Sequence, residues 1–294
     1  MRLRLALQLI PALLLGGAAY GVDVRSATHL GSFAWHHDAE WFGGWSGLEL
    51  SDDGQSMTVL SDRARIATAR IPRVDGRIAA VEDLRHWPVR SSGNSDLQGR
   101  AGDSEGLAIA PDGTIYISFE AVPRVARYAA MGGPAEVLPR AAAFRDQPIN
   151  GSLEALAMDG QGRLYTMSET ARSPDGRIPV HRWDGRSWTT PFTLPERGGF
   201  APVAADFGPD GRLYVLERAA TLIAFRSRLR RWEVTEDGVG GEETLFATPH
   251  GRHDNLEGLS VWRDAEGALR ATMVSDDNFF GLQRTELVEY ALPD

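Results

Sequence analysis

The 294-residue chain contains no cysteine and no lysine. Without cysteine it cannot form disulfides, a cysteine-ligated zinc site, a lipid-modified N-terminal cysteine or a thiol nucleophile. Without lysine, Schiff-base chemistry and a lysine general base are excluded. Every one of the 31 basic residues is therefore arginine, and only seven histidines are present. None of these histidines recurs in the repeat described below, which disfavours zinc.

Long helical patterns and familiar hydrolase motifs are also missing. No long segment has the periodicity of an amphipathic helix. The sequence has no Gly-x-Ser-x-Gly elbow, no P-loop and no His-Glu-x-x-His motif. Hydrolysis through a serine nucleophile therefore has no local support.

Residues 1–21 have the pattern of a secretory signal peptide. Arg2 and Arg4 precede the apolar stretch from Leu5 to Leu15, and small residues follow up to Ala19. The stretch is too short for a comfortable membrane span. We expect cleavage near Ala19 and a periplasmic or secreted bacterial protein with no stable membrane insertion. An uncleaved anchor is the alternative.

The charge balance of the chain is acidic, with a formal net charge of −9. Loss of Arg2 and Arg4 with the signal would change −9 to −11. This balance argues against a general affinity for nucleic acid or anionic membranes and favours the binding of cations. We expect a monomer whose partners are a divalent cation and a small-molecule anionic ester substrate.

The sequence does contain one motif that is repeated five times, and we call this repeated motif the phrase. Each copy has apolar residues alternating on either side of an Asp-Gly, Gln-Gly or Glu-Gly turn, which is the pattern of a β-hairpin. The turn chemistry is clear in Pro111-Asp-Gly113, because Pro presets φ and Gly accepts a positive φ. The turn glycines lie 49 to 59 residues apart, at positions 54, 113, 162, 211 and 267.

Each interval between turns also holds a second, weaker strand pair. Examples are 124–128 with 135–138, and 180–183 with 188–192. Four strands in each period of about 50 residues indicate an all-β fold, a β-propeller of four-stranded blades. We expect one domain, residues 22–294, with five blades. A sixth blade is possible if a degenerate copy lies in 63–100 or 218–250.

The ends of the mature chain are expected to close the ring. Residues 28–33 have no partner strand nearby and should pair with the C-terminal strand 286–290. An open β-sandwich or a solenoid is the alternative architecture.

Three of the five phrases begin with a glutamate: Glu105, Glu154 and Glu257. The copies at Ser46 and Val203 lack it. In a propeller the innermost strand begins, and the second strand ends, on the face opposite the turn. The three glutamates should therefore surround the axis at one mouth of the central channel. Slightly outside them we expect the acids that end the second strands: Asp62, Glu120, Glu169, Glu217 and Asp276 or Asp277.

Carboxylates gathered at one mouth repel each other unless a cation or shared protons neutralise them. A hard cation with six to eight oxygen ligands, Ca²⁺ in particular, would serve. Alternatively, duplication copied the acids, or they accept hydrogen bonds from neighbouring blades. Arg63, Arg172 and Arg218 follow the second-strand acids and are candidates for holding an anion. His253, in the segment before Glu257, is a weaker candidate for a general base.

The ordered series of motifs resembles the phytase-like family of exported bacterial propellers, described as having esterase-like activity of phytase. The motifs are Ser46-Gly-Leu, Ser61-Asp-Arg63, Glu105-Gly-Leu, Glu154-Ala-Leu and Asn255-Leu-Glu257-Gly-Leu with Ser275-Asp-Asp-Asn278. The resemblance implies a calcium-associated propeller that hydrolyses phosphate or other esters. The Glu-Gly-Leu openings are also similar to those of calcium-dependent lactonase propellers, in which such a glutamate binds the metal.

The sequence thus leads to one main hypothesis and one alternative. The main hypothesis is an exported, Ca²⁺-dependent hydrolase of phosphate or carboxylic esters, lactones included. Its metal ligands would be Glu105, Glu154 and Glu257; Asp62, Glu169 or Asp276 would be the base, and Arg63 and Arg218 would hold the anionic group. Phytate is disfavoured as substrate, because the dense lysine and acid equipment of phytate-degrading propellers is not visible. The alternative is a non-catalytic periplasmic binding or scaffold propeller with a structural ion.

Overall fold

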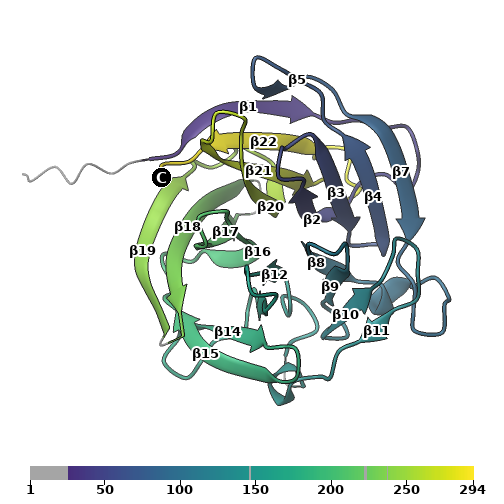
Figure 1. Ribbon diagram of the computed structural model, residues 1–294, viewed down its shortest axis with the longest axis vertical. Coiled ribbons are helices and arrows are strands. Elements are labelled where there is room, and N and C mark those ends of the chain that lie inside the picture. Colours follow the sequence, from purple (N-terminus) through teal and green to yellow (C-terminus); the bar gives the residue numbers. More distant parts are fainter. Residues whose placement is uncertain (1–25, 146, 222–223, 237) are drawn as a thin grey trace, which may run out of the picture.

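The computed structural model describes residues 26–145, 147–221, 224–236 and 238–294, and they form five four-stranded antiparallel sheets around one axis (Figure 1). The predicted β-propeller is therefore confirmed, with five blades in the described part of the chain. The predicted signal peptide, residues 1–21, lies outside the described residues. Among the described residues, no helix has the length and apolar character needed to cross a membrane.

Each blade is built from strands in chain order, but a short extra hairpin interrupts blade 1, and the N-terminal strand completes the fifth blade. The blades are β2 (Trp45–Leu50), β3 (Ser56–Ser61), β4 (Arg65–Arg70) and β7 (Glu82–Pro88); β8 (Ser104–Ile109), β9 (Ile115–Phe119), β10 (Arg124–Tyr128) and β11 (Glu136–Val137); β12 (Ala155–Met158), β13 (Leu164–Met167), β14 (Ile178–Trp183) and β15 (Trp188–Leu194); β16 (Ala201–Phe207), β17 (Leu213–Ala220), β18 (Phe225–Thr235) and β19 (Gly238–Ala247); and β20 (Asn255–Arg263), β21 (Leu269–Asp276), β22 (Glu286–Ala291) and β1 (Thr28–Ala34).

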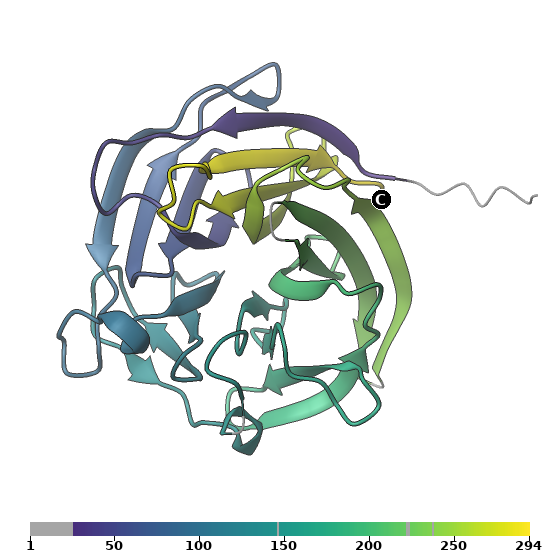
Figure 2. The same ribbon diagram turned by 180° about the vertical axis from the view of Figure 1, so that it is seen from behind.

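The two ends of the described chain close the ring within the fifth blade. Strand β1 pairs antiparallel with β22, from Thr28 opposite Ala291 to Ala34 opposite Glu286. Both views show β1 outside β22 in the same sheet (Figure 1, Figure 2). The predicted pairing of 28–33 with 286–290 is confirmed. This closure joins the first and last strands of the described chain in one sheet.

The two intervals suspected of hiding a sixth blade contain other structure. The first holds an additional two-stranded hairpin, β5 (Arg73–Val74) and β6 (Arg77–Ile78), beside blade 1. The second is filled by the long outer strands β18 and β19 of blade 4. The helical elements of the described chain are two short 3₁₀ helices, Gly99–Ala101 and Ala142–Phe144.

The five turn glycines have the backbone conformation that the sequence predicts. Their φ angles lie between +65° and +85°, in the left-handed region that favours glycine. In the second blade the turn is closed by the Gly113 N–H, which donates to the Ala110 carbonyl at 2.8 Å. Asp112 accepts a hydrogen bond from the Thr114 N–H at 2.9 Å. These turns fix the register of the innermost hairpins, and hence the face on which each hairpin ends.

The hydrophobic core is divided into five clusters, one at each contact between neighbouring blades. Near the axis the innermost strands pack closely. A Cβ on Gly106 would lie 2.6 Å from the Leu156 Cβ, and one on Gly47 would lie 2.8 Å from the Leu107 Cβ. The glycine of the repeated phrase is therefore required for packing. The space on the axis measures only about 10 Å³, so side chains close the centre and separate the two faces.

Candidate functional site: an acidic mouth with two unlike sides

The three glutamates that open the repeated phrases come together at one end of the axis. Glu105 is in β8, Glu154 directly precedes β12 and Glu257 is in β20. They are only 7 %, 7 % and 9 % exposed. Burial raises the pKa of Glu105 well above its usual range, and the charges of Glu154 and Glu257 raise it further. The pKa of Glu154 is raised for the same reasons, first by burial and then by Glu257 and Glu169.

Two acids from the ends of second strands adjoin these glutamates. Asp62 follows β3, and Asp276 ends β21. Burial raises the pKa of Asp62 to about 6, with a further contribution from Glu257, although Arg63 opposes the shift. Burial raises the pKa of Asp276 to about 8, and the charges of Glu257 and Asp62 add to this. The two aspartates therefore titrate apart, on either side of neutral pH.

The expectation that Glu217 lies with these acids is wrong. Its side chain is fully buried in blade 4, where it accepts hydrogen bonds from Arg228 Nε at 2.6 Å and Arg230 Nε at 2.7 Å. Counting from the turn explains the error. Glu120 and Glu169 stand seven residues after Gly113 and Gly162, whereas Glu217 stands six after Gly211. One residue of difference turns a strand side chain to the opposite face.

The residue in the equivalent position of blade 4 is Arg218, seven after its turn glycine. Its Nη1 donates to Asn255 Oδ1 at 2.7 Å and to Glu257, and its Nη2 donates to Glu169 Oε1 at 2.8 Å. Asn255 Nδ2 also donates to Glu257 at 2.8 Å. Burial alone would lower the pKa of Arg218, but the charges of Glu257 and Glu169 raise it. We call Arg218, Glu169, Asn255 and Glu257 the arginine side of the mouth.

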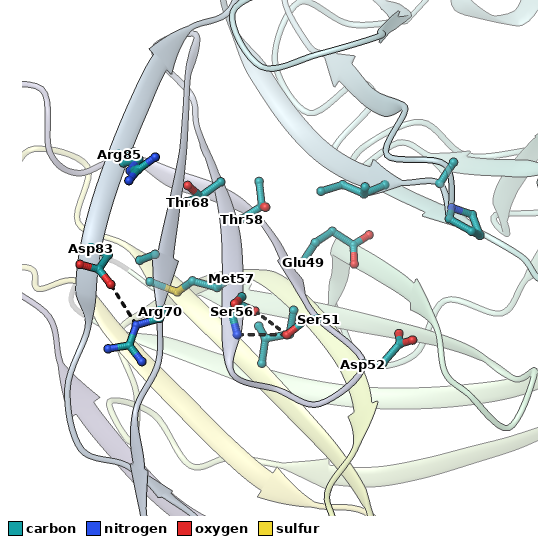
Figure 3. A pocket seen from close by; sticks show the side chains of 15 residues that line it. Glu49, Ser51, Asp52, Ser56, Met57, Thr58, Thr68, Arg70, Asp83 and Arg85 are labelled. Atoms are coloured by element: carbon teal, nitrogen blue, oxygen red, sulfur yellow. Dashed lines mark hydrogen bonds and ion pairs between the residues drawn. The ribbon is translucent and has the colours of Figure 1, made fainter.

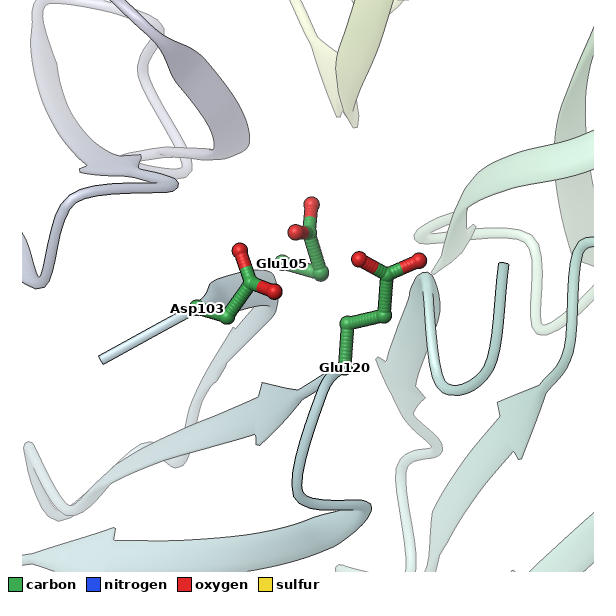
Figure 4. A group of neighbouring side chains, drawn as sticks. All are labelled: Asp103, Glu105 and Glu120. Atoms are coloured by element: carbon green, nitrogen blue, oxygen red, sulfur yellow. The ribbon is translucent and has the colours of Figure 1, made fainter. Parts of the chain in front are cut away.

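On the blade 2 side of the mouth, three carboxylates lie together. Oxygens of Asp103, Glu105 and Glu120 are all within 4.8 Å of one another, and the side chains point into the same space (Figure 4). No salt bridge joins any of the three to a basic group in the described part of the chain. Burial is the largest cause of a raised pKa at each of them. We call this group the carboxylate side.

Asp103 was missed in the sequence, although a signal for it exists. It stands two residues before Glu105, and residues two apart on an extended chain share a face. The same spacing places Asn255 before Glu257 and Ser152 before Glu154. Each of the three phrases that open with a glutamate therefore has a second polar residue, two positions before that glutamate.

In the two phrases without an opening glutamate, the residue in the place of the glutamate contributes to packing. Ser46 is buried, and its hydroxyl donates to the Ser104 carbonyl at 2.8 Å, which links blades 1 and 2. Val203 is buried in the cluster between blades 4 and 5. Neither departure therefore adds a charged group to the mouth.

The other residues singled out in the sequence have different surroundings. Arg63 is exposed, with its guanidinium carbon 3.2 Å from the centre of the Phe279 ring. Arg172 turns outward to Glu196, with Nε and Oε2 3.4 Å apart. His253 is buried against Tyr290, its Nε2 2.8 Å from the hydroxyl. Burial lowers the pKa of His253 to about 4, so it is uncharged at neutral pH.

The opposite face of the propeller has cavities of its own. One of about 860 Å³ is lined by blade 1 and the following turn, including Glu49, Asp52, Arg70 and Asp83 (Figure 3). Arg70 Nε donates to Asp83 at 2.9 Å, so part of its charge is already paired. Because the centre of the propeller is closed, this cavity does not communicate with the acidic mouth along the axis.

Solved structures show where the fold recurs. The gluconolactonase XC5397 of Xanthomonas campestris is 16 % identical, with 85 % of this chain and 86 % of that chain covered and a TM-score of 0.50. The PQQ-bound aldose sugar dehydrogenase of Streptomyces coelicolor is 12 % identical and has a TM-score of 0.46; the match covers 89 % of this chain and 98 % of that chain. Virginiamycin B lyase of Staphylococcus aureus is 16 % identical and has a TM-score of 0.44; the match covers 90 % of this chain and 74 % of that chain. At these identities the likeness is one of fold.

No curated protein matches the chain at the level of sequence. The model of one protein family does match, over residues 40–279, a range that includes both sides of the acidic mouth. The chain therefore belongs to the phytase-like family, described as having esterase-like activity of phytase.

Proposed function

We propose that this propeller hydrolyses ester bonds, of phosphate or carboxylic acids and including lactones, at the acidic mouth. One observation carries the proposal: the three carboxylates of the carboxylate side, which have no salt bridge to a described basic residue, share a mouth with the guanidinium of Arg218. Family membership supports a hydrolase of this kind.

The carboxylate side fits a hard divalent cation. Asp103, Glu105 and Glu120 offer oxygens within 4.8 Å of one another, and Ca²⁺ prefers several carboxylate, carbonyl and water oxygens in irregular arrangements. Desolvation and mutual repulsion, which raise the pKa of Glu105, would be relieved by such an ion. When bound, the cation would polarise an ester oxygen and lower the pKa of a water molecule. Glu154 lies beside this group and is a further candidate ligand.

The arginine side is less suited to a cation. The carboxylate of Glu257 already accepts hydrogen bonds from Arg218 and Asn255. A second positive charge beside Arg218 would be repelled. Of the three glutamates that the sequence proposed as ligands, we therefore retain Glu105 and consider Glu257 a partner of Arg218.

Asp62 and Asp276 are suited to moving protons in opposite directions. With a pKa of about 6, Asp62 is mostly ionised at neutral pH and can accept a proton from water. With a pKa of about 8, Asp276 is mostly protonated and can donate to the leaving alkoxide. In the step, the water oxygen bonds to the acyl carbon or phosphorus, the ester C–O or P–O bond breaks, and the alcohol leaves with a proton. Glu169 remains a candidate base, and Arg63 a candidate anion ligand.

Turnover assays test this proposal directly. Purified protein is incubated with p-nitrophenyl acetate, p-nitrophenyl phosphate and gluconolactone, in Ca²⁺ and in EDTA. We expect turnover of at least one substrate, lost in EDTA, and a decrease in kcat of about 100-fold or more in Asp62→Asn. Asp52→Asn, an exposed acid at the turn end of the same hairpin, is the matched control and should leave kcat unchanged. Absence of turnover with all three substrates would reject the hydrolase and favour the non-catalytic propeller.

A further inference from the structure

A cavity of about 530 Å³ lies next to the arginine side of the mouth. Its lining includes Thr221 after β17, Phe225 of β18, His253 before β20, and Phe280, Leu282 and Arg284 from the loop after β21. The Phe225 ring centre is 6.0 Å from the guanidinium carbon of Arg218. The cavity and the mouth therefore share a border at Arg218.

The loop after β21 displays apolar side chains beside this cavity. Phe280 is 56 % exposed and Leu282 is 87 % exposed. Four large hydrophobic residues are at least 56 % exposed in the described part of the chain, and two of them stand two positions apart here. Contiguous exposed apolar groups on a soluble protein commonly mark a binding surface.

Hydrogen bonds hold this loop in place. Asp277 accepts from the Gly44 N–H at 3.0 Å, and its carbonyl accepts from the Phe280 N–H at 2.8 Å. Asp254 accepts from the Arg284 N–H at 3.0 Å and from Gln283 Nε2 at 3.3 Å. The apolar side chains are thus presented by an anchored loop, and little ordering would be needed on binding.

Of the polar groups that line the cavity, one is cationic: Arg284, whose Nε lies 3.5 Å from Glu286 Oε2. The other polar groups are neutral or already hydrogen-bonded. The pKa of His253 is lowered to about 4 by burial, so its ring is uncharged near neutral pH. The carboxylate of Asp254 is engaged by the loop that it anchors. The cavity volume lies within the range of small-molecule sites. An uncharged, apolar group suits these surroundings better than a phosphorylated one.

We propose that this cavity receives the apolar acyl group of a carboxylic ester or lactone whose scissile bond lies at the acidic mouth. The inference rests on the proposed hydrolase and narrows its substrates to esters with an aliphatic or aromatic acyl group of moderate size. Polyphosphorylated polyols would place anions against Phe280, Leu282 and the neighbouring acids, and are disfavoured.

A chain-length series tests the cavity. With p-nitrophenyl acetate, butyrate and hexanoate, kcat/KM should rise about three- to fourfold for each added methylene until the cavity is filled. Leu282→Ser and Phe280→Ser should lower kcat/KM about tenfold on the hexanoate and leave the acetate unchanged. Val74→Ser, which removes an equally exposed apolar side chain from β5, is the matched control and should change neither. No dependence on chain length, or equal losses on all esters, would overturn the cavity proposal.

A binding measurement separates failure of the cavity from failure of the hydrolase. Hexanamide and acetamide are uncharged analogues of the acyl group, and their binding is followed by calorimetry without any turnover. Hexanamide should bind at least tenfold more tightly than acetamide, with the preference lost in Leu282→Ser. If no ester is hydrolysed but this preference holds, the hydrolase fails and the cavity stands. If esters are hydrolysed without the preference, the cavity proposal fails alone.

Discussion

The two sides of the acidic mouth solve the same electrostatic problem differently. On the arginine side, the charges of Glu257 and Glu169 are balanced by Arg218, a residue of the chain itself. On the carboxylate side, Asp103, Glu105 and Glu120 converge without a salt bridge to any described basic residue. Both sides come from the same position of the same repeat, since Arg218 and Glu120 each stand seven residues after a turn glycine.

The difference teaches how a repeated hairpin can yield an asymmetric site. A single change of sign in blade 4 gives one side an internal cation that offsets part of its negative charge, and leaves the other dependent on protons or a cation from solution. If blade 4 also had an acid in the position of Arg218, the carboxylates around the mouth would repel one another on every side. The asymmetry also gives each side its own response to mutation, pH and Ca²⁺.

The largest expected effect is loss of the internal cation. Arg218→Gln leaves the buried Glu257 and the partly buried Glu169 without their partner, and the free energy of unfolding should fall by about 3 kcal/mol. For a domain of this size, that corresponds to a melting temperature about 6–12 °C lower. Urea denaturation of the metal-free protein near neutral pH measures the change.

The control for this variant is Arg172→Gln on the same face. Its Nε lies 3.4 Å from the exposed Glu196, and its Nη1 donates to the carbonyls of Glu169 and Ala171 at 2.8 and 3.0 Å, so its removal should cost only about 1 kcal/mol. Equal losses in the two variants would show that Arg218 makes only a surface ion pair.

A double mutant sharpens the pairing of Arg218 with Glu257. In Arg218→Gln combined with Glu257→Gln, the orphaned charge is removed as well, so part of the stability should return. We expect a coupling energy of about 1–3 kcal/mol from the cycle of single and double variants, measured by urea denaturation. Strict additivity would mean that the two side chains do not stabilise each other.

The pH dependence of stability follows from the raised pKa values. Asp276 has a folded-state pKa of about 8, far above the ordinary aspartate value of 3.8, so the folded protein binds the proton that the unfolded chain releases. Its stabilising contribution is full below the unfolded value and is lost as pH rises towards about 8. Metal-free protein should lose on the order of 4 kcal/mol between about pH 5 and 8, and Asp276→Asn should flatten this slope. A metal-free stability that rises over this window would contradict the assignment.

The smallest expected effect on metal-free stability is at the carboxylate side. Because burial and neighbouring charges raise the pKa of Glu105 well above its usual range, Glu105→Gln replaces a carboxyl whose charged form is disfavoured with a neutral amide of similar shape. The metal-free protein should change by less than about 1 kcal/mol, towards greater stability. Its melting temperature should no longer rise with Ca²⁺. A preserved Ca²⁺ response would remove Glu105 from the ligand set.

The sequence was sufficient for the architecture because the repeat determines it. Turn glycines at a fixed spacing specify hairpins, and a strand unpartnered at each end specifies ring closure. The convergence of Glu105, Glu154 and Glu257 at one mouth follows from the same reasoning. Residue composition alone, without the register of each phrase, would not have placed them.

The partners within the mouth were harder to predict, because they depend on single-residue register. Glu217 looked equivalent to Glu169 yet faces Arg228 and Arg230, while its neighbour Arg218 takes the mouth position. Counting from the turn glycine distinguishes the two. The cavity beside Arg218 could not be predicted, because Phe225 at the start of β18 and two loop residues, His253 and Phe280, approach one another only in the folded ring.

Calorimetric titration with Ca²⁺ tests the central claim, that the carboxylate side binds a divalent cation and the arginine side does not. Wild-type protein, Asp103→Asn and Glu257→Gln are compared near neutral pH. We predict one Ca²⁺ bound by the wild type, binding weakened at least tenfold in Asp103→Asn, and binding retained in Glu257→Gln. Unchanged binding in Asp103→Asn together with its loss in Glu257→Gln would contradict the account and place the cation beside Arg218.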